Sequence, residues 1–283
     1  MKKADVVVVG GSAAGLTAAI TARRHYPHKR TLLVRKEEKV LIPCGIPYIF
    51  GTVGSPDKNL IPDAALEMNG IELLRTEVTG IDRGKHKLST ADGERIEYDR
   101  LVIATGSLPV MPPIPGFDKD GVYTIMKDIP HLERLQAALE SVKDLVILGG
   151  GFIGVEFADE CKKAATERNV TIVELLPHCL MLAYDEEFCA AAEKLLEERG
   201  IGVATGERVS AFEGGEAVVS VKLDDGAVLK ADAVISAVGV APVVDLARQA
   251  ELRLGPTASL VVDRTMRTED ECVFACGDCA EKV

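Results

Sequence analysis

The feature that most constrains this chain is a strand that runs directly into a glycine-rich turn and then a helix. In its first copy, four consecutive valines in the run 5–9 predict a strand buried on both faces. The turn that follows consists of small residues, Gly10, Gly11, Ser12, Ala13, Ala14 and Gly15. A helix over 16–24 and a strand over 31–34 complete a β-turn-α-β unit of about thirty residues, the context in which a glycine motif is informative.

The same order recurs later, as a strand at 145–148, a glycine turn at 149–154, a helix over 155–163 and a strand at 170–174. A further buried strand closes each copy, at 101–106 and at 234–239. The turn-rich stretches 71–98 and 201–231 alternate in polarity and predict antiparallel meanders. We therefore expect an α/β fold with two Rossmann-like three-layer domains, each with a parallel sheet and an antiparallel meander. The expected domains are 1–111 together with 244–283, and 112–243.

The second glycine turn predicts a dinucleotide site. Gly149, Gly151 and Gly154 have the G-x-G-x-x-G spacing, and a helix N-terminus free of side chains can accept a pyrophosphate. Tight packing of strand on helix is the alternative reading of glycines alone. Glu174 ends the next strand, where a carboxylate accepts hydrogen bonds from ribose hydroxyls and repels a 2′-phosphate. No Arg follows it in 175–179, so NAD is favoured over NADP.

The first turn matches the pattern less fully, because Ser12 replaces the middle glycine. Arg35 stands where an acid is expected, and Lys36 and Glu37 follow it. Glu37 is a candidate for the ribose contact, and a solvated loop is the alternative. Near the end of the chain a short strand at 273–276 leads to Gly277 and Asp278, and such an Asp can accept hydrogen bonds from a polyol or act as a turn residue.

Composition narrows the partners. The formal net charge of −11 argues against nucleic acids and anionic membranes, and no apolar stretch approaches the ~20 residues of a membrane span. Small molecules or proteins are the expected partners. Seven cysteines, an odd number, do not predict a secreted disulfide framework, so a reducing cytoplasm is expected. The five histidines form no metal-ligand spacing with them.

Together these motifs resemble the FAD-dependent pyridine nucleotide-disulfide oxidoreductases, over essentially the whole chain. The resemblance implies that the first unit binds FAD and the second binds NAD(H). It places Asp278 at the ribityl chain, Phe152 over the flavin ring until nicotinamide displaces it, and Glu156 near the nicotinamide. The implied FAD residues are Gly10, Gly11, Ser12, Ala13, Ala14, Gly15, Arg35, Lys36, Glu37, Val78, Ala104, Thr105, Gly106, Gly277 and Asp278. The implied NAD residues are Gly149, Gly151, Phe152, Ile153, Gly154, Glu156, Glu174 and Gly239.

The segment Pro43-Cys44-Gly45-Ile46-Pro47-Tyr48 resembles the single-cysteine branch of that family, which contains coenzyme A-disulfide reductases, NADH oxidases and peroxidases, and persulfide reductases. Dithiol members carry a second cysteine five residues later, where this chain has Ile49. Oxidised Cys44 would then be a mixed disulfide with a small thiol or a sulfenic acid. A helix beginning over 45–50 would help keep its thiolate ionised. An ordinary buried thiol is the alternative, and it is our reading of Cys161, Cys179 and Cys189.

The resemblance also implies the acceptor. Thr17 and Arg24 match the first-helix residues that contact coenzyme A (CoA) in the disulfide reductases, although a solvated Arg24 is the default. Val40 and Pro43 replace polar residues near the cysteine, as in thermophilic CoA-dependent sulfur reductases or NADH oxidases. We expect electrons to pass from NAD(P)H through FAD to Cys44 and on to a CoA disulfide, CoA persulfide or polysulfide. The alternatives are an NADH oxidase or peroxidase with a Cys44 sulfenic acid, and a flavoprotein that carries electrons to a protein. The family forms homodimers, whose interface domain we expect to lie beyond Val283.

Overall fold

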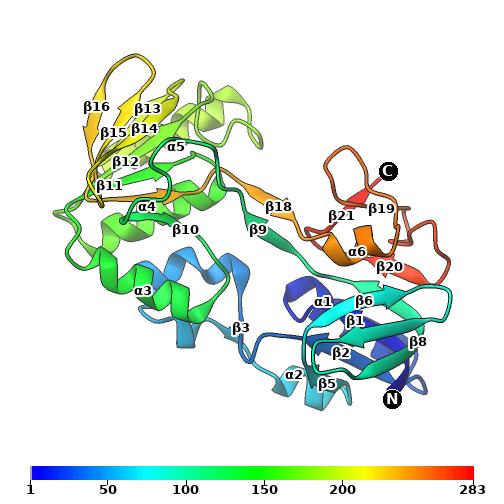
Figure 1. Ribbon diagram of the computed structural model, residues 1–283. Helices are drawn as coiled ribbons and strands as arrows, with labels where there is room; N and C mark the ends of the chain where they lie inside the picture. The colour runs from blue at the N-terminus through cyan, green and yellow to red at the C-terminus, as the bar shows by residue number, and fades with distance from the viewer. Residues whose placement is uncertain (1) are drawn as a thin grey trace. The chain divides into compact units, whose positions relative to one another are not determined.

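The computed structural model describes residues 2–283, which form two compact units (Figure 1). The first unit comprises 2–43, 60–108 and 241–283, and the second comprises 44–59 and 109–240. Residues 44–59, which the sequence pattern assigns to the first domain, therefore pack within the second unit. The sequence pattern could not predict this packing. It shows the order of the elements along the chain, but not which unit a short segment without regular strands or helices packs against. The α/β fold class is confirmed, and each unit is described by itself below.

The first unit is built on a sheet with the strand order β5-β2-β1-β8-β7-β6, in which β20 also pairs with β8. The pairs among β1, β2, β5, β8 and β20 are parallel, whereas β7 pairs antiparallel with both β6 and β8. The long strand β8 pairs along one side with β1 and along the other with β7 and then β20. The sheet strands are β1 (Lys2–Val9), β2 (Thr31–Arg35), β5 (Glu72–Arg75), β6 (Val78–Asp82), β7 (Lys87–Thr90), β8 (Arg95–Ile103) and β20 (Val273–Ala275).

Alternating side chains of the central strand β1 divide the core of this unit between two layers. Val8 packs on the side of Ala19 in α1 (Ala13–His25) and of Leu66 in α2 (Ala64–Met68). Val7 packs on the opposite side, with the residues of α6 (Asp245–Gln249) and β19. Both layers bury apolar area, which explains why the strand run lacks polar residues. The remaining short strands are β3 (Val40–Leu41), β4 (Leu60–Ile61), β19 (Leu260–Val262) and β21 (Ala280–Lys282).

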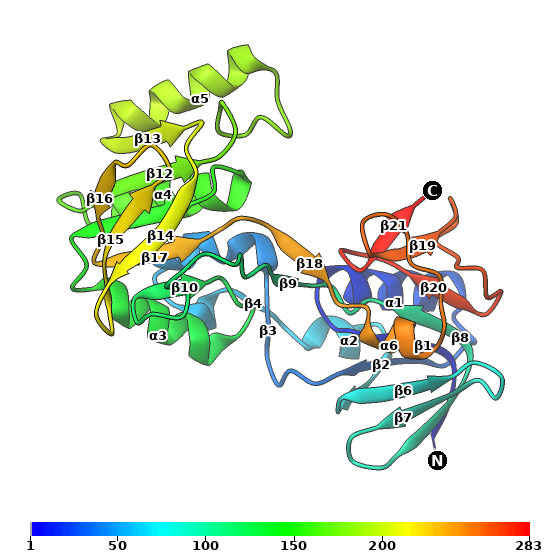
Figure 2. The ribbon, with the colours of Figure 1, turned by 45° about the horizontal axis from the view of Figure 1, so that its top comes forward.

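The second unit contains a parallel sheet of order β10-β17-β11-β12-β13 and a separate antiparallel sheet, β14-β15-β16 (Figure 2). Val146, Val173 and Val234 of the parallel sheet pack against Phe212 and Val221 of the antiparallel one. The strands are β10 (Val122–Thr124), β11 (Asp144–Leu148), β12 (Asn169–Glu174), β13 (Ile201–Thr205), β14 (Val209–Gly214), β15 (Val218–Leu223), β16 (Val228–Lys230) and β17 (Ala233–Ser236). The helices are α3 (Ile129–Leu139), α4 (Phe152–Ala164) and α5 (Glu186–Glu198).

Both antiparallel regions are shorter than the predicted meanders. The stretches 71–98 and 201–231 each begin with a strand, β5 and β13, that joins the parallel sheet. Each strand lies at the outer edge of its sheet, beside β2 or β12. The antiparallel part is confined to β6–β8 in the first unit and β14–β16 in the second. The strands β9 (Ser107–Pro109) and β18 (Val240–Pro242) pair where the chain passes from one unit to the other.

Candidate functional site

The first glycine turn joins β1 to α1 with little room for side chains. Gly10 has φ +111°, and a Cβ placed on it would lie 2.1 Å from the Ala104 carbonyl oxygen. A Cβ on Gly15 would lie 2.0 Å from the Gly10 oxygen. Ser12 caps α1 without a side-chain hydrogen bond, and the first turn of the helix has no acidic residue. The first N–H groups of α1 therefore keep the partial positive charge that suits a phosphate.

Arg35, the last residue of β2, lies beside this turn and is almost completely buried. A Cβ on Gly11 would lie 2.5 Å from the Arg35 Cδ, so Gly11 leaves room for the arginine stem. The guanidinium pairs with Asp63 at 2.8 Å and donates to the main-chain oxygens of Glu37 and Glu38. Burial alone would raise the pKa of Asp63, but Arg35 and Arg75 outweigh it and hold that pKa below its usual range. Arg35 thus holds the main chain of the loop after β2, whose other charged side chains, Lys36, Glu37 and Glu38, are exposed.

The loop residues that follow Arg35 are exposed. Lys36 forms an ion pair with Glu77 at 3.1 Å. The Glu37 carboxylate extends from the loop whose main chain Arg35 holds. Val78, the first residue of β6, is buried in the core of the unit. Lys36 and Glu37 therefore lie at the carboxyl end of β2, whereas Val78 contributes its side chain to packing.

Two further strand ends come together with the first glycine turn. Ala104, Thr105 and Gly106 follow β8, and the Thr105 hydroxyl donates to the Val243 oxygen at 2.6 Å. Gly277, after β20, has φ +79°, and a Cβ on it would lie 2.8 Å from the Ala14 Cβ. The Ser107 hydroxyl donates to Asp278 Oδ2 at 2.6 Å. The structure thus brings 10–15, 104–106 and 277–278 to one edge of the sheet, and adds Ser107, which carries no motif that sequence reasoning could have used.

The second glycine turn repeats this arrangement between β11 and α4. A Cβ on Gly149 would lie 2.7 Å from the Ala237 oxygen, and one on Gly154 would lie 1.9 Å from the Gly149 oxygen. Gly151 differs from both, because a Cβ on it would meet nothing within 4 Å. Gly151 is also the N-cap of α4, without a side-chain cap and with no acidic residue in the first turn. Its open side is where a pyrophosphate can approach the helix N-terminus.

Glu174 occupies in this unit the position that Arg35 occupies in the first. It ends β12, and a Cβ on Gly150 would lie 3.1 Å from the Glu174 Cβ. Its carboxylate accepts hydrogen bonds from the N–H groups of Gly150 and of Leu176, the latter at 2.7 Å. Opposite charges therefore stand at equivalent places in the two units, beside the second glycine of each turn.

An exposed aromatic cluster adjoins the second turn. Phe152 is 53% exposed, and its ring meets Tyr184 edge-on at 5.8 Å, while Tyr184 lies 6.5 Å from Phe188. Ile153 is also exposed. One turn further along α4, burial raises the pKa of Glu156 above its usual range. Gly239, after β17, has φ +119° and open space at its Cβ position. Tyr184 was missed because nothing in its local sequence marks it as the contact of Phe152.

Cys44 is exposed, in contrast to the other six cysteines, all of which lie within the described residues and are buried or intermediate. It lies in a single 3-10 turn, η1 (Pro43–Gly45), followed by η2 (Pro47–Phe50). No α-helix begins over 45–50, so the expected helix N-terminus beside the thiol is wrong. Gly51 ends η2, and Pro56 opens another 3-10 turn, η3 (Pro56–Lys58), so no helix has room to develop.

Burial makes several of the remaining cysteines poor nucleophiles. Cys161, Cys179 and Cys189 are fully buried, as predicted. Burial raises the pKa of Cys161 and of Cys179 to about 12, and that of Cys276 to about 11. Thiols with such pKa values stay protonated near neutral pH and do not attack disulfides readily.

Thr17 and Arg24 are exposed on α1, seven residues apart. Seven residues correspond to two helical turns, so the two side chains share a helix face. This placement leaves both side chains available to a ligand on that face.

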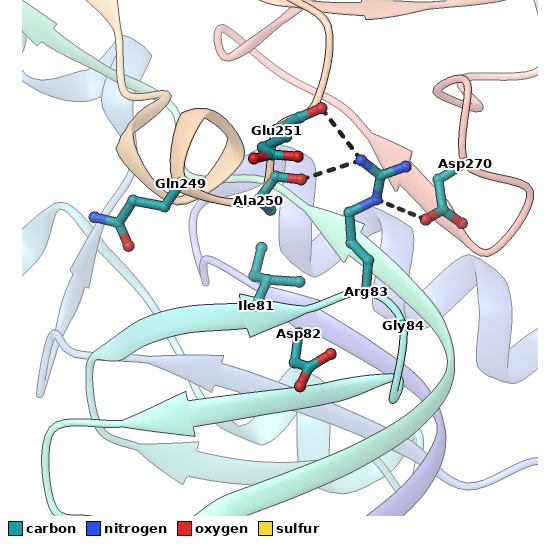
Figure 3. A pocket seen from close by; sticks show the side chains of 8 residues that line it. All are labelled: Ile81, Asp82, Arg83, Gly84, Gln249, Ala250, Glu251 and Asp270. Atoms are coloured by element: carbon teal, nitrogen blue, oxygen red, sulfur yellow. Dashed lines mark hydrogen bonds and ion pairs between the residues drawn. The ribbon is translucent and has the colours of Figure 1, made fainter.

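One pocket lies away from all of these residues, between the turn after β6 and the end of α6 (Figure 3). Its volume is about 570 Å³, and its one arginine, Arg83, is already engaged. Arg83 donates to Asp270 at 2.9 Å and to the oxygens of Ala250 and Glu251 (Figure 3). It therefore ties α6 to the sheet and is not available to a phosphate.

Within residues 2–283, no group of three or more His, Cys, Asp or Glu side chains is arranged to hold a metal ion. None of the helices in this part of the chain has both the length and the apolarity to cross a membrane.

Comparisons with known proteins agree with this geometry. The chain is 35% identical to the NAD(P)H coenzyme A polysulfide/persulfide reductase of Pyrococcus horikoshii, over 99% of this chain and 63% of that protein. It is 33% identical to the NADH oxidase of Methanocaldococcus jannaschii, over 98% of this chain and 63% of that protein. The chain thus spans 63% of the length of either relative.

A solved structure extends the likeness to three dimensions. The NAD-dependent persulfide reductase from A. fulgidus superposes with a TM-score of 0.89 at 32% identity, over 98% of this chain and 53% of the other. The family model for pyridine nucleotide-disulphide oxidoreductases matches residues 4–283, which include both glycine turns, Cys44 and Asp278. Proteins of this family bind FAD and NAD(P)H. The chain belongs to the pyridine nucleotide-disulphide oxidoreductase family.

Proposed function

We propose that the first unit binds FAD, that the second binds NAD(H), and that Cys44 is the redox group that reduces a small CoA-linked sulfur compound. The FAD residues are the first turn with 104–106 and 277–278, and the loop of Arg35, Lys36 and Glu37 lies at the ribose end. The NAD residues are the second turn with Phe152, Ile153, Glu156, Glu174 and Gly239. The observation that carries the proposal is that Cys44 alone among the seven cysteines is exposed.

The glycine turns fit dinucleotides because their helices begin without caps and without acidic residues. In the second turn the open side of Gly151 admits a pyrophosphate, while the Glu174 carboxylate retains acceptor capacity for ribose hydroxyls. A 2′-phosphate would meet that carboxylate at close range, which favours NAD(H) over NADP(H). At the same sheet edge as the first turn, the Asp278 carboxylate accepts a hydrogen bond from Ser107 and is a group that can also accept from a polyol.

The cofactors supply a hydride from nicotinamide and an electron pair for sulfur. This chain supplies the sulfur. The Cys44 thiolate attacks a CoA persulfide at the sulfur bound to CoA, forming the Cys44–CoA mixed disulfide and releasing hydrosulfide. With a CoA disulfide the leaving group is the CoA thiolate. Two electrons and one proton then convert the mixed disulfide to the Cys44 thiolate and free CoA, which restores the starting state.

CoA is the proposed thiol for two reasons. Thr17 and Arg24 share an exposed face of α1, where an arginine can pair with a phosphate of CoA. The P. horikoshii relative is named for a CoA polysulfide or persulfide. Both reasons concern the same small-molecule class, a thiol on a phosphorylated carrier.

A second candidate is an NADH oxidase in which oxidised Cys44 is a sulfenic acid. The M. jannaschii relative, named an NADH oxidase, supports it. Oxygen uptake with NADH in the absence of CoA would favour this function. NADH oxidation that depends on added CoA disulfide or persulfide and proceeds without oxygen uptake would favour the first.

Replacement of the thiol tests the proposal. We expect Cys44→Ser in the FAD-loaded protein to retain NADH-to-dye transfer and to lose NADH-dependent reduction of CoA disulfide by about a thousandfold. Cys272→Ser is the matched control, because Cys272 is also partly accessible but lies outside the glycine turns and should leave both assays unchanged. Disulfide reduction that survives in Cys44→Ser would refute the role of Cys44.

A further inference from the structure

Glu160 is a buried acid on α4 that neither glycine motif explains. Its side chain is 6% exposed, and it lies eight residues after Phe152 on the helix that begins at the second turn. Burying a carboxylate is unfavourable unless hydrogen bonds and charges compensate for the lost water. The compensation here comes from Thr52, in the segment that begins with Cys44.

The Thr52 hydroxyl lies 2.8 and 2.7 Å from the two Glu160 oxygens. Lys163 Nζ, one turn further along α4, donates to the same hydroxyl at 2.7 Å and lies 3.8 Å from Glu160. The lysine therefore orients the hydroxyl, whose proton is left to the carboxylate. A hydrogen bond to a charged acceptor is stronger than one between neutral groups.

The main chain beside Thr52 is fitted closely to the same acid. A Cβ on Gly51 would lie 2.5 Å from the Glu160 main-chain oxygen and 2.6 Å from its Oε2. The Phe50 ring lies 5.0 Å from the Phe157 ring. Phe50 and Gly51 thus contact successive turns of α4. At position 51 only glycine fits, because any side chain would collide with Glu160.

The rest of the segment is held at its ends and from α3. Gln136 Nε2 donates to the Ile49 and Gly54 oxygens at 3.3 and 3.1 Å. A Cβ on Gly45, the neighbour of Cys44, would lie 1.9 Å from Asn59 Oδ1, so the start of the segment packs on its end. Contacts from α3 and α4 therefore hold residues 49–54, while main-chain hydrogen bonds such as Ile49 N–H to the Ile46 oxygen and the Gly45–Asn59 contact link the start of the segment to the rest of it.

We propose that Glu160 is a positioning residue that fixes the Cys44 segment, residues 44–59, on α4 through Thr52. The helix that presents the second glycine turn at its start thereby holds the cysteine segment along its length. Glu160 does not touch the reacting sulfur; it acts through Thr52 and Gly51. The inference rests on the proposed role of Cys44 for its effect on catalysis, but not for its effect on the segment.

Two changes test the link. Thr52→Val keeps the shape of an exposed side chain and removes the hydroxyl, and Glu160→Ala removes the acid. We expect each to raise hydrogen–deuterium exchange across 44–59 and to raise the alkylation rate of Cys44 by iodoacetamide at least about threefold. In the FAD-loaded protein, kcat for CoA disulfide should fall about tenfold because the sulfur is misplaced, while NADH-to-dye transfer stays within about twofold.

Thr52→Ser and Asp159→Asn are the controls. Thr52→Ser restores the hydroxyl and should behave as the parent protein. Asp159 neighbours Glu160 on α4 but pairs with Arg199, away from the segment, so Asp159→Asn should change neither readout. Unchanged exchange and alkylation in both Thr52→Val and Glu160→Ala would overturn the inference. If Cys44→Ser still reduces CoA disulfide, the proposed function is overturned. The link between Glu160 and the segment 44–59 is then decided by hydrogen–deuterium exchange alone.

Discussion

At the residue scale, Arg35 is buried beside the first glycine turn, and its charge is compensated by an acid that lies far along the sequence. The arginine side chain is 2% exposed and its partner Asp63 is 26% exposed. Removing one member of a buried pair leaves a charge without compensation, which is more costly than losing a surface ion pair. The turn after β2 is therefore stabilised by α2, which Asp63 precedes.

We predict that Asp63→Ala lowers the free energy of unfolding by about 2 kcal/mol, a discounted value because Asp63 keeps some solvent contact. The loss should depend on pH. A carboxylate whose folded pKa is depressed stabilises fully above its unfolded pKa, near 3.8, and that stability disappears as pH falls through the folded pKa. Urea melts at pH 7 and pH 3 measure this. Glu72→Gln, which breaks an exposed pair with Arg30, is the control and should leave stability unchanged. Equal losses at both pH values would contradict the ionic role.

Sequence reasoning located the residues with a motif and missed those defined by tertiary contact. Arg35 was recognised as standing at the acidic position, and the structure confirms that it is equivalent to Glu174 beside the second glycine. Its partner Asp63 lies 28 residues away, and Thr52 lies 108 residues from Glu160. No local pattern predicts contacts between residues so far apart in the sequence, because helix and strand periodicity describe only neighbours along the chain.

At the scale of the element, glycines within one motif have different physical roles. Gly154 is required by packing, because the Gly149 oxygen occupies its Cβ position, whereas Gly151 faces open space. Gly151 also has φ −71°, which any residue adopts. An alanine substitution at Gly154 should therefore affect packing, whereas the same substitution at Gly151 should affect ligand binding.

We predict that Gly154→Ala destabilises the protein by about 3 kcal/mol, through overpacking against main chain. Gly151→Ala should cost no more than about 1 kcal/mol, as an N-cap change. It should nevertheless raise the Kd for NADH about tenfold, because its methyl group occupies the approach to the α4 N-terminus. Thermal melts and NADH titration measure the two effects. A Gly151→Ala protein that binds NADH as tightly as the parent would contradict the assignment of this turn to NAD(H).

Elements were predictable where both periodicity and turn residues agreed. The helix predicted over 155–163 extends over Phe152–Ala164, and the strand predicted at 170–174 is Asn169–Glu174. The 3-10 turns around Cys44 were not predictable, because closely spaced Gly and Pro residues allow several turn types and the packing on α3 and α4 selects among them.

At the scale of the whole molecule, a repeated nucleotide-binding fold has been adapted to two ligands. Both units place a glycine turn, an uncapped helix and a closing strand in the same order, but Arg35 and Glu174 give the turns opposite charges. The repeat was visible in the sequence because glycine spacing survives in both copies. The packing of 44–59 within the second unit was not, because it depends on side chains of α3 and α4.

Intact-protein mass spectrometry of the FAD-loaded protein tests the central claim, that Cys44 receives electrons from NADH and exchanges with CoA. After incubation with CoA disulfide, we predict an added mass of one CoA, localised to Cys44 by peptide analysis and absent from Cys44→Ser. Addition of NADH should then remove that mass without another reductant. An adduct on a different cysteine, or one on Cys44 that NADH leaves in place, would contradict the account.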